Sequence, residues 1–186
     1  MAEPRAQIDH LVVAARTIDE GVAWCEATLG VAPGPGGAHP LFGTHNRLLK
    51  LDGPDGMAQP AYLEIIAIDP KATPTRAAHQ RRWFDLDDAV MHARLAQHGP
   101  QLVHWVASVP DIGAAVAALK AIGIQRGPVV SASRQTPQGL LQWHVSVRDD
   151  GQRLFNGALP TLIQWNGTRP TAHMADSGIT LRQLRL

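Results

Sequence analysis

Short apolar runs alternate along the chain with segments of helical periodicity. Residues 8–15 form an apolar run that is typical of a strand buried on both faces. Residues 18–29 carry apolar side chains three or four positions apart, the spacing of one helical stripe. Thr17 and Glu20 form a capping box at the start of this helix, and Gly30 ends it. The pattern predicts a strand followed by a helix.

The second half of the chain repeats this pattern. At an offset of 94 residues, His10 falls on His104 and Ile18 falls on Ile112. The second helix ends at Gly123, just as the first ends at a glycine. A repeat of this length indicates a duplicated supersecondary unit rather than a solenoid of short repeats.

Strand-like runs separated by turn residues follow each helix. The runs are 45–51 and 61–68 in the first copy, and 127–134, 139–147 and 159–165 in the second. Residues 30–40 are so rich in Gly and Pro that we expect a loop there. The order of strand, helix and three strands, repeated, predicts an α+β fold of two βαβββ modules related by pseudo-two-fold symmetry.

The remaining segments frame these two modules within a single domain over residues 1–186. We expect module one at 6–69, a linker helix region at 70–100, module two at 101–166 and a C-terminal extension at 167–186. Residues 86–98 read as the linker helix, and the alternating residues 178–186 read as one more edge strand. An exposed strand of this kind could join two copies of the chain, so a homodimer is a possible assembly.

Composition and charge narrow the class of partner. The net charge of +1, from 17 basic and 16 acidic side chains, provides no field for nucleic acid or anionic lipid. The single Cys25 excludes an internal disulfide and suits a reducing compartment. No apolar run has the length of a signal peptide or of a membrane span. We therefore expect a cytoplasmic protein with a small-molecule partner and with neither a nucleic-acid nor a membrane partner.

Two polar side chains interrupt the apolar strands of the first copy. His10 shares a face with Val12, and Glu64 lies in the middle of the run 61–68. A carboxylate buried at such a place is costly unless it is protonated, paired or bound to a cation. In the second copy His104 recurs, and Gln164 takes the place that corresponds to Glu64.

Packing about a pseudo-two-fold axis brings these four positions to the centre of the molecule. Imidazole nitrogens with carboxylate and amide oxygens form a donor set that suits Zn²⁺, Ni²⁺, Fe²⁺, Co²⁺ or Mn²⁺. The alternative interpretation is that each histidine is a core residue with a backbone partner and that Glu64 meets an arginine.

Four stretches resemble the glyoxalase-like domain branch of the vicinal oxygen chelate superfamily. They are "IDHLVVAARTIDEGVAWCEATLGV", "GTHNRLLKL", "YLEIIAI" and "LPTLIQW", and the resemblance extends over residues 6–166. It implies paired βαβββ modules whose curved mixed sheets enclose a cavity, and a divalent metal held by the first and last strands of each module. The implied metal ligands are His10, Glu64, His104 and Gln164. Gln164 departs from the glutamate that is commoner there, and a neutral amide binds metal more weakly and cannot act as a base.

Further polar and aromatic residues are candidates for substrate binding. His45, Asn46 and Arg47 begin a strand after a flexible loop, where they could orient a substrate carboxylate or carbonyl. A turn cap with surface charge is the alternative for this group. Trp143 is either a wall of the cavity or an ordinary core residue. The remaining loop and helix histidines, to which we assign no role, are His39, His79, His92, His98 and His173.

Three functional hypotheses follow. The first is a metal-dependent enzyme that stabilises an enediolate or oxyanion of a small oxygenated metabolite, with Glu64 as ligand and catalytic base. Isomerase, lyase and dioxygenase chemistry all fit this description. The second is a metal-free protein that binds or sequesters a small molecule in the same cavity. The third is a structural interaction module.

Overall fold

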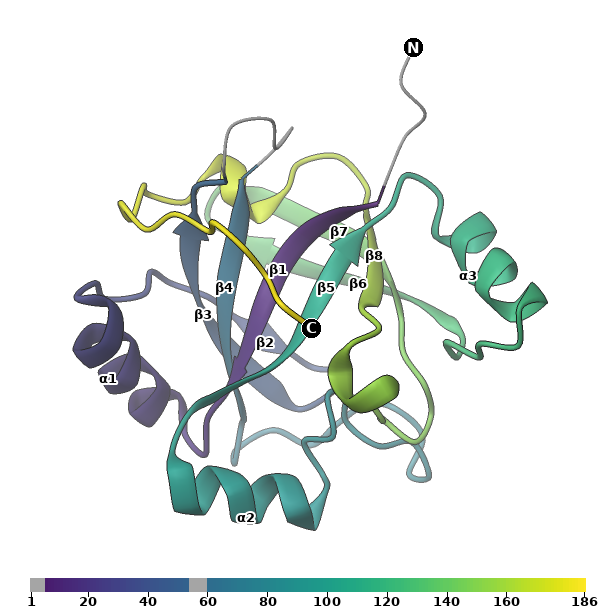
Figure 1. The fold of residues 1–186 in the computed structure, drawn as a ribbon, viewed down its shortest axis with the longest axis horizontal. Helices are drawn as coiled ribbons and strands as arrows, with labels where there is room; N and C mark the ends of the chain where they lie inside the picture. Colours follow the sequence, from purple (N-terminus) through teal and green to yellow (C-terminus); the bar gives the residue numbers. More distant parts are fainter. Residues whose placement is uncertain (1–5, 54–59) are drawn as a thin grey trace.

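A computed structural model describes residues 6–53 and 60–186, and its strands form one curved eight-stranded sheet (Figure 1). The first half contains β1 (Gln7–Ala14), α1 (Ile18–Leu29), β2 (Ala38–His39), β3 (Thr44–Leu51) and β4 (Ala61–Ile68). The second half contains β5 (Gln101–Ser108), α3 (Ile112–Ala121), β6 (Val129–Thr136), β7 (Gly139–Ser146) and β8 (Thr161–Trp165). Each half is a βαβββ module, so the predicted fold class is confirmed. The exact domain boundaries stay predictions.

The order of the strands displays the predicted pseudo-two-fold symmetry. The order is β2-β3-β4-β1-β5-β8-β7-β6, in which the two modules run outward from a central antiparallel pair of β1 and β5. β1 lies parallel to β4, and β5 lies parallel to β8 in the same way. The two modules therefore share one continuous sheet.

Alternation along the strands separates an inner from an outer face. Val12 and Val106 belong to the inner core cluster together with Trp83. On the outer face, Ile65 packs with Cys25 of α1 in a second cluster. Period-two alternation explains this division, because neighbouring residues of a strand point to opposite faces. The inner face forms the wall of the site described below.

Helix α1 is held at its start in a different way from the expected capping box. The Thr17 hydroxyl accepts a hydrogen bond from the Glu20 backbone N–H at 3.1 Å, as predicted. The Glu20 carboxylate accepts instead from the backbone N–H and the guanidinium of Arg16. At the other end Gly30 has φ of 73°, which glycine adopts without steric cost.

Helix α2 (Ala89–His98) links the two modules and closes one end of the curved sheet (Figure 1). Asp88 is its N-cap, so the helix begins three residues later than predicted. Met91 and Leu95 are buried and pack into the inner core cluster. Two short 3₁₀ turns, η1 (Phe155–Gly157) and η2 (Pro170–Ala172), flank β8.

The predicted edge strand over residues 178–186 is wrong. Only Thr180 forms a bridge, to Asp52 just beyond the end of β3. The tail meets the end of β3 through two backbone hydrogen bonds, from Asp52 N–H to the Ile179 carbonyl at 2.9 Å and from Leu181 N–H to the Asp52 carbonyl at 2.7 Å. The tail instead packs its apolar residues Leu181 and Leu184 against the outer core cluster.

The segment 30–40 is not wholly a loop, because it contains the two-residue strand β2. This correction matters for the site, since β2 carries His39. The two outer edges of the sheet approach one another where Arg134 of β6 donates to Asn46 of β3 at 3.2 Å. The sheet is thus nearly closed into a barrel.

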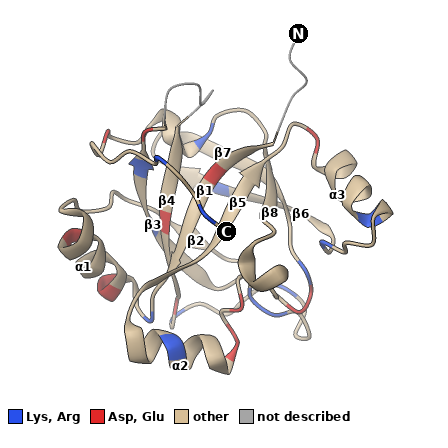
Figure 2. Cartoon of the chain, in the orientation of Figure 1, with Lys and Arg blue, Asp and Glu red and all other residues tan. Residues whose placement is uncertain are grey.

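Charged residues are scattered over the elements in the view of Figure 2, and acidic positions occur within β1 and β4. Within residues 6–53 and 60–186, no helix is both long and apolar enough to cross a membrane. The cytoplasmic location stays a prediction.

Candidate active site

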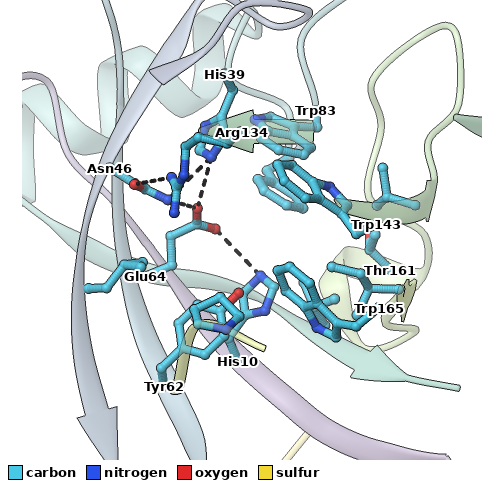
Figure 3. A pocket seen from close by; sticks show the side chains of 16 residues that line it. His10, His39, Asn46, Tyr62, Glu64, Trp83, Arg134, Trp143, Thr161 and Trp165 are labelled. Atoms are coloured by element: carbon cyan, nitrogen blue, oxygen red, sulfur yellow. Dashed lines mark hydrogen bonds and ion pairs between the residues drawn. The ribbon is translucent and has the colours of Figure 1, made fainter. Parts of the chain in front are cut away.

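A buried carboxylate stands at the centre of the inner face. Glu64 lies in the middle of β4, and its residue surface is only 4% exposed. Its Oε1 accepts a hydrogen bond from Asn46 Nδ2 at 2.6 Å, and its Oε2 lies 3.5 Å from His10 Nε2 (Figure 3). Burial alone would raise the pKa of Glu64, but the nearby His10, His39 and Asn46 lower it to about 2. The carboxylate is therefore ionised at neutral pH.

His10 is held between two carboxylates. Its Nδ1 lies 2.7 Å from Asp9 Oδ1, and its ring stacks on Tyr62 with centroids 4.5 Å apart. Burial lowers the pKa of His10, but the hydrogen bonds and charges of Asp9 and Glu64 outweigh burial and raise it to about 9. At neutral pH the ring is thus an imidazolium whose Nε2–H faces Glu64. The alternative of a backbone-bonded core histidine does not describe His10.

Asp9 orients the ring of His10 from behind. The residue is fully buried, and its Oδ2 accepts hydrogen bonds from Trp165 Nε1 at 2.9 Å and from the Arg169 guanidinium. Burial opposes ionisation, but His10 and Arg169 together hold the pKa of Asp9 below its usual value. Asp9 was not predicted as a site residue, although an acid beside His10 within an apolar strand is a visible signal in the sequence.

A second histidine approaches Glu64 from β2. His39 Nε2 lies 3.9 Å from Glu64 Oε1, and His39 Nδ1 lies 3.1 Å from the Thr44 hydroxyl. Burial lowers the pKa of His39 to about 4, in spite of the neighbouring Glu64 charge. His39 is therefore neutral where His10 is charged. His39 was not predicted as a site residue, because it lies in a segment rich in Gly and Pro with no periodicity.

Asn46 is oriented by a small network. Its Oδ1 accepts from the Gly37 backbone N–H at 2.8 Å and from Arg134 at 3.2 Å, which directs its Nδ2 toward Glu64. The approach is so close that a Cβ at Gly36 would lie 2.0 Å from the Asn46 carbonyl oxygen. Glycine at this position is thus required for the strand edge to reach the site.

The space in front of the His10 and Glu64 pair is a small cavity. Its volume of about 40 Å³ has room for roughly three water molecules. Figure 3 shows Asn46, Arg134 and Glu64 on one side and the indole rings of Trp83, Trp143 and Trp165 across from them. Two larger hollows, of about 350 and 260 Å³, adjoin it and share lining residues with it. The small cavity therefore shares its walls with two larger hollows.

His104 and Gln164 have other contacts. His104 Nε2 accepts from the Thr161 backbone N–H at 3.1 Å, and burial with nearby arginine charges lowers the pKa of His104 to about 3. Gln164 Oε1 accepts from the Ile112 backbone N–H at 2.9 Å, at the start of α3. Neither residue lines the cavity.

The register of the strands explains why Gln164 is displaced. Glu64 is paired with Val12 on β1, and Thr161 is paired with Val106 on β5. Since Val12 and Val106 correspond in the repeat, Thr161 is the counterpart of Glu64. The sequence pattern matched Gln164 with Glu64. The strand register shows that the counterpart of Glu64 lies three residues earlier, at Thr161.

The four candidate substrate-binding residues divide into two pairs. Asn46 and Trp143 line the cavity. Arg47 is exposed, and His45 is half-buried and does not line the cavity. Arg134, which the sequence analysis did not single out, places a guanidinium in the cavity wall instead.

Comparison with protein families decides the affiliation of the chain. The glyoxalase-like domain family matches residues 8–186. The chain belongs to this family. The resemblance seen in the sequence is thereby confirmed. No curated protein sequence matches the chain.

Solved structures similar to this glyoxalase-like domain share its fold at low identity. A variant of Streptomyces coelicolor methylmalonyl-CoA epimerase in complex with 2-nitronate-propionyl-CoA is 21% identical, with 85% of this chain and 93% of that chain covered and a TM-score of 0.50. A methylmalonyl-CoA epimerase in complex with methylmalonyl-CoA and NH4+ is 21% identical, with 86% and 94% covered and a TM-score of 0.51. A hypothetical protein from Staphylococcus aureus is 16% identical, with 88% and 60% covered and a TM-score of 0.58.

The four side chains that the sequence resemblance implies as metal ligands do not converge on one point in this glyoxalase-like domain. Of the four expected ligands only His10 and Glu64 approach one another, because His104 and Gln164 bind backbone N–H groups. Within residues 6–53 and 60–186, no group of three or more His, Cys, Asp or Glu could hold a metal ion. The roles of His10 and Glu64 as metal ligands stay predictions.

Proposed function

We propose that this glyoxalase-like domain is an enzyme of the isomerase type that moves a proton on a small carbonyl compound. Glu64 acts as the base and His10 as the acid. The observation that carries the proposal is the approach of Glu64 Oε2 to His10 Nε2, 3.5 Å apart in a buried cavity. A charged acid and a charged base held this close in a cleft are typical of a catalytic site.

The first step forms an enol. Glu64 takes the proton from the carbon next to the carbonyl, and the C–H electron pair becomes a C=C bond. The carbonyl electron pair moves to oxygen, which receives the Nε2 proton of His10. In an α-hydroxycarbonyl compound this product is a neutral enediol.

The second step completes the isomerisation. Glu64 returns its proton to the former carbonyl carbon, and the hydroxyl of the other carbon gives its proton back to His10. A new carbonyl forms at that carbon, and both residues return to their starting charge. Atoms and protons balance without a co-reactant.

The ion pair adjusts the strength of the base during the reaction. The positive charge of His10 is one reason why the pKa of Glu64 is about 2 in the resting site. When His10 gives its proton to the substrate oxygen, that charge disappears and the pKa of Glu64 rises. Proton transfer by the acid thus makes the base stronger at the moment when the base is needed.

Arg134 and the tryptophans would hold the substrate. Arg134 forms no ion pair with the described acidic residues, and its one hydrogen bond there is to Asn46. A substrate oxygen in the cavity would meet this cation, while Trp143 and Trp165 exclude water from the other side. The acyl-CoA complexes of the similar epimerases support a carbonyl ligand on this fold.

The alternative function is metal-free binding or sequestration of a small molecule. The observation that favours it is the apolar wall of Trp83, Trp143 and Trp165 beside hollows of about 350 and 260 Å³. A binder would retain ligand affinity in the variant Glu64→Gln and would exchange no protons. An enzyme would lose exchange in that variant.

Proton exchange in deuterated water tests the proposal. Small α-hydroxycarbonyl compounds and acyl thioesters are incubated with the protein, and ¹H NMR follows loss of the signal of the proton next to the carbonyl. We expect exchange with at least one class of compound, and its loss in Glu64→Gln. Glu26→Gln is the matched control, because Glu26 is exposed on α1. Exchange that persists in Glu64→Gln would contradict the proposal.

A metal analysis separates this chemistry from the metal-dependent hypothesis. Protein purified without a histidine tag and treated with a chelator is expected to keep its exchange activity. Stoichiometric transition metal that is lost in His10→Ala, together with loss of exchange after chelation, would support a metal-dependent reaction instead.

The homodimer also stays a prediction, and sedimentation of the same sample tests it.

A further inference from the structure

Arg126 is a buried cation without a matching anion. The residue is 4% exposed, and its one hydrogen bond among the described residues runs from a terminal nitrogen to the Thr161 hydroxyl at 3.2 Å. Its Nε is buried and has no hydrogen-bond partner among the described residues. No described acidic residue forms an ion pair with it, whereas the two neighbouring arginines each have one. A guanidinium with this burial is normally paired.

A small hollow lies against this side chain. Its volume of about 10 Å³ has room for about one particle of the size of water. Arg126, Ser146 and Thr161 line it together with Trp83 and Phe84. Thr161 and these two aromatic residues also line the cavity in front of Glu64. The hollow is therefore a neighbour of the active site.

Among the described charged residues around the hollow, one positive charge has no negative partner. Arg148 is paired with Asp150, and Arg153 is paired with Asp85. Burial and the charge of Arg148 lower the pKa of Arg126 to about 10, so the guanidinium remains protonated at neutral pH. The hollow thus offers a positive field that no described carboxylate neutralises.

The pseudo-symmetry of the fold allows the charges at corresponding positions of the two modules to be compared. In the first module, the last strand places the Glu64 carboxylate beside a charged histidine. In the second module the counterpart is Thr161, which bonds to Arg126 and to the neutral His104. The first module offers a negative group to a ligand, and the second offers a positive one.

We propose that the hollow beside Arg126 binds a small anion. The anion is either a free halide or the carboxylate of a molecule that occupies the adjoining cavity. The halide case is independent of the proposed function, whereas the carboxylate case rests on it and would add a carboxylate to the substrate class.

Bromide is the probe for a direct test. Crystals of the full chain are soaked in sodium bromide, and anomalous scattering locates the ion. We expect a bromide peak within hydrogen-bonding distance of the Arg126 guanidinium, and no such peak in Arg126→Met. Absence of the peak from wild-type crystals would overturn the proposal.

Thermal unfolding at constant ionic strength provides the test in solution. A bound anion stabilises the folded chain, so the melting temperature should rise with bromide and reach a plateau. Arg126→Met should not respond, whereas Arg16→Met, which removes only an exposed ion pair, should respond like the wild type. An equal response of Arg126→Met would overturn the proposal. If Arg126→Met fails to fold, Arg126→Lys replaces it and should bind bromide more weakly.

Sodium formate distinguishes the two sources of the anion. Formate that displaces bromide from the wild type indicates a carboxylate site, and bromide binding that formate does not affect indicates a halide site. Both results support an anion site. The readout requires no catalysis, so Glu64→Gln should retain bromide even though it should lose proton exchange. Failure of this proposal is thereby distinguishable from failure of the proposed function.

Discussion

Thr161 occupies, in the second module, the position that Glu64 occupies in the first. The two residues correspond because each is paired with the equivalent valine of its neighbouring strand. The fold is therefore symmetric in its backbone and asymmetric in its chemistry. The carboxylate of the first module faces His10, while the hydroxyl of the second module faces His104 and Arg126.

The first prediction concerns this hydroxyl. Thr161→Val keeps the shape of the side chain but removes the hydroxyl that accepts from Arg126, so this buried cation loses its hydrogen bond. We expect the free energy of unfolding to fall by about 2 kcal/mol, measured by urea titration. Thr168→Val is the control, since Thr168 is exposed and should change stability by less than about 0.5 kcal/mol. Equal effects of the two substitutions would contradict this account.

Gln164 provides a test of the corrected register. Gln164→Leu removes the acceptor of the Ile112 backbone N–H, so α3 should lose about 1 kcal/mol of stabilisation. Proton exchange should be unchanged, because the side chain does not line the cavity. A fall in the rate of proton exchange as large as that of Glu64→Gln would contradict the corrected register and indicate that Gln164 belongs to the active site.

The sequence revealed His10 and Glu64 because a polar residue within an apolar strand is visible without a structure. The fold was also predictable, since periodicity and helix caps recur in both halves. Asp9 was not predicted, because strict alternation of side chains along a strand would place it on the face opposite to His10. The β1 and β5 pairing shifts its register between Ile8 and His10, and this irregularity allows the Asp9 carboxylate to reach the ring.

Two further features depended on details that the sequence does not encode locally. The offset between the modules is 94 residues at His10 and His104 but 97 at Glu64 and Thr161, because the connections between strands differ in length. Alignment of the sequence near the last strands therefore selected Gln164. His39 reaches Glu64 only because β2 pairs with β3, a contact that no periodicity announces.

Arg134 and Arg47 form a matched pair for testing substrate binding. Arg134 lines the cavity, whereas Arg47 is exposed on the neighbouring strand β3. Arg134→Met should lower the rate of proton exchange at low substrate concentration by roughly 10- to 100-fold, because a charge-assisted hydrogen bond is lost. Arg47→Met should leave the rate unchanged. A fall in the rate for Arg47→Met with no change for Arg134→Met would instead support the prediction from the sequence that Arg47 binds the substrate.

The buried ion pair predicts how stability depends on pH. The pKa of His10 is raised from 6.5 to about 9, so its contribution is present below pH 6.5 and is lost as pH rises to about 9. The pKa of Glu64 is lowered from 4.5 to about 2, so its contribution is present above pH 4.5 and is lost as pH falls to about 2. The ion pair therefore stabilises the fold most between pH 4.5 and pH 6.5.

Urea unfolding from pH 6 to pH 9.5 measures the upper limb. Wild-type stability should fall by an amount on the order of 3 kcal/mol as His10 loses its proton. The slope should be absent in His10→Gln and unchanged in the exposed control His79→Gln. A wild-type profile that is as flat as that of His10→Gln would contradict the proposed charge state.

Direct observation of the His10 ring is the most decisive measurement. Nitrogen-15 NMR of histidine-labelled protein reports whether each ring nitrogen carries a proton, and His10→Gln assigns the signal. Since Asp9 and Glu64 hold the ring between them, both nitrogens should remain protonated at neutral pH and titrate with a pKa of about 9. A ring that is neutral at pH 7, with an unprotonated Nε2 facing Glu64, would contradict the assignment of His10 as the acid.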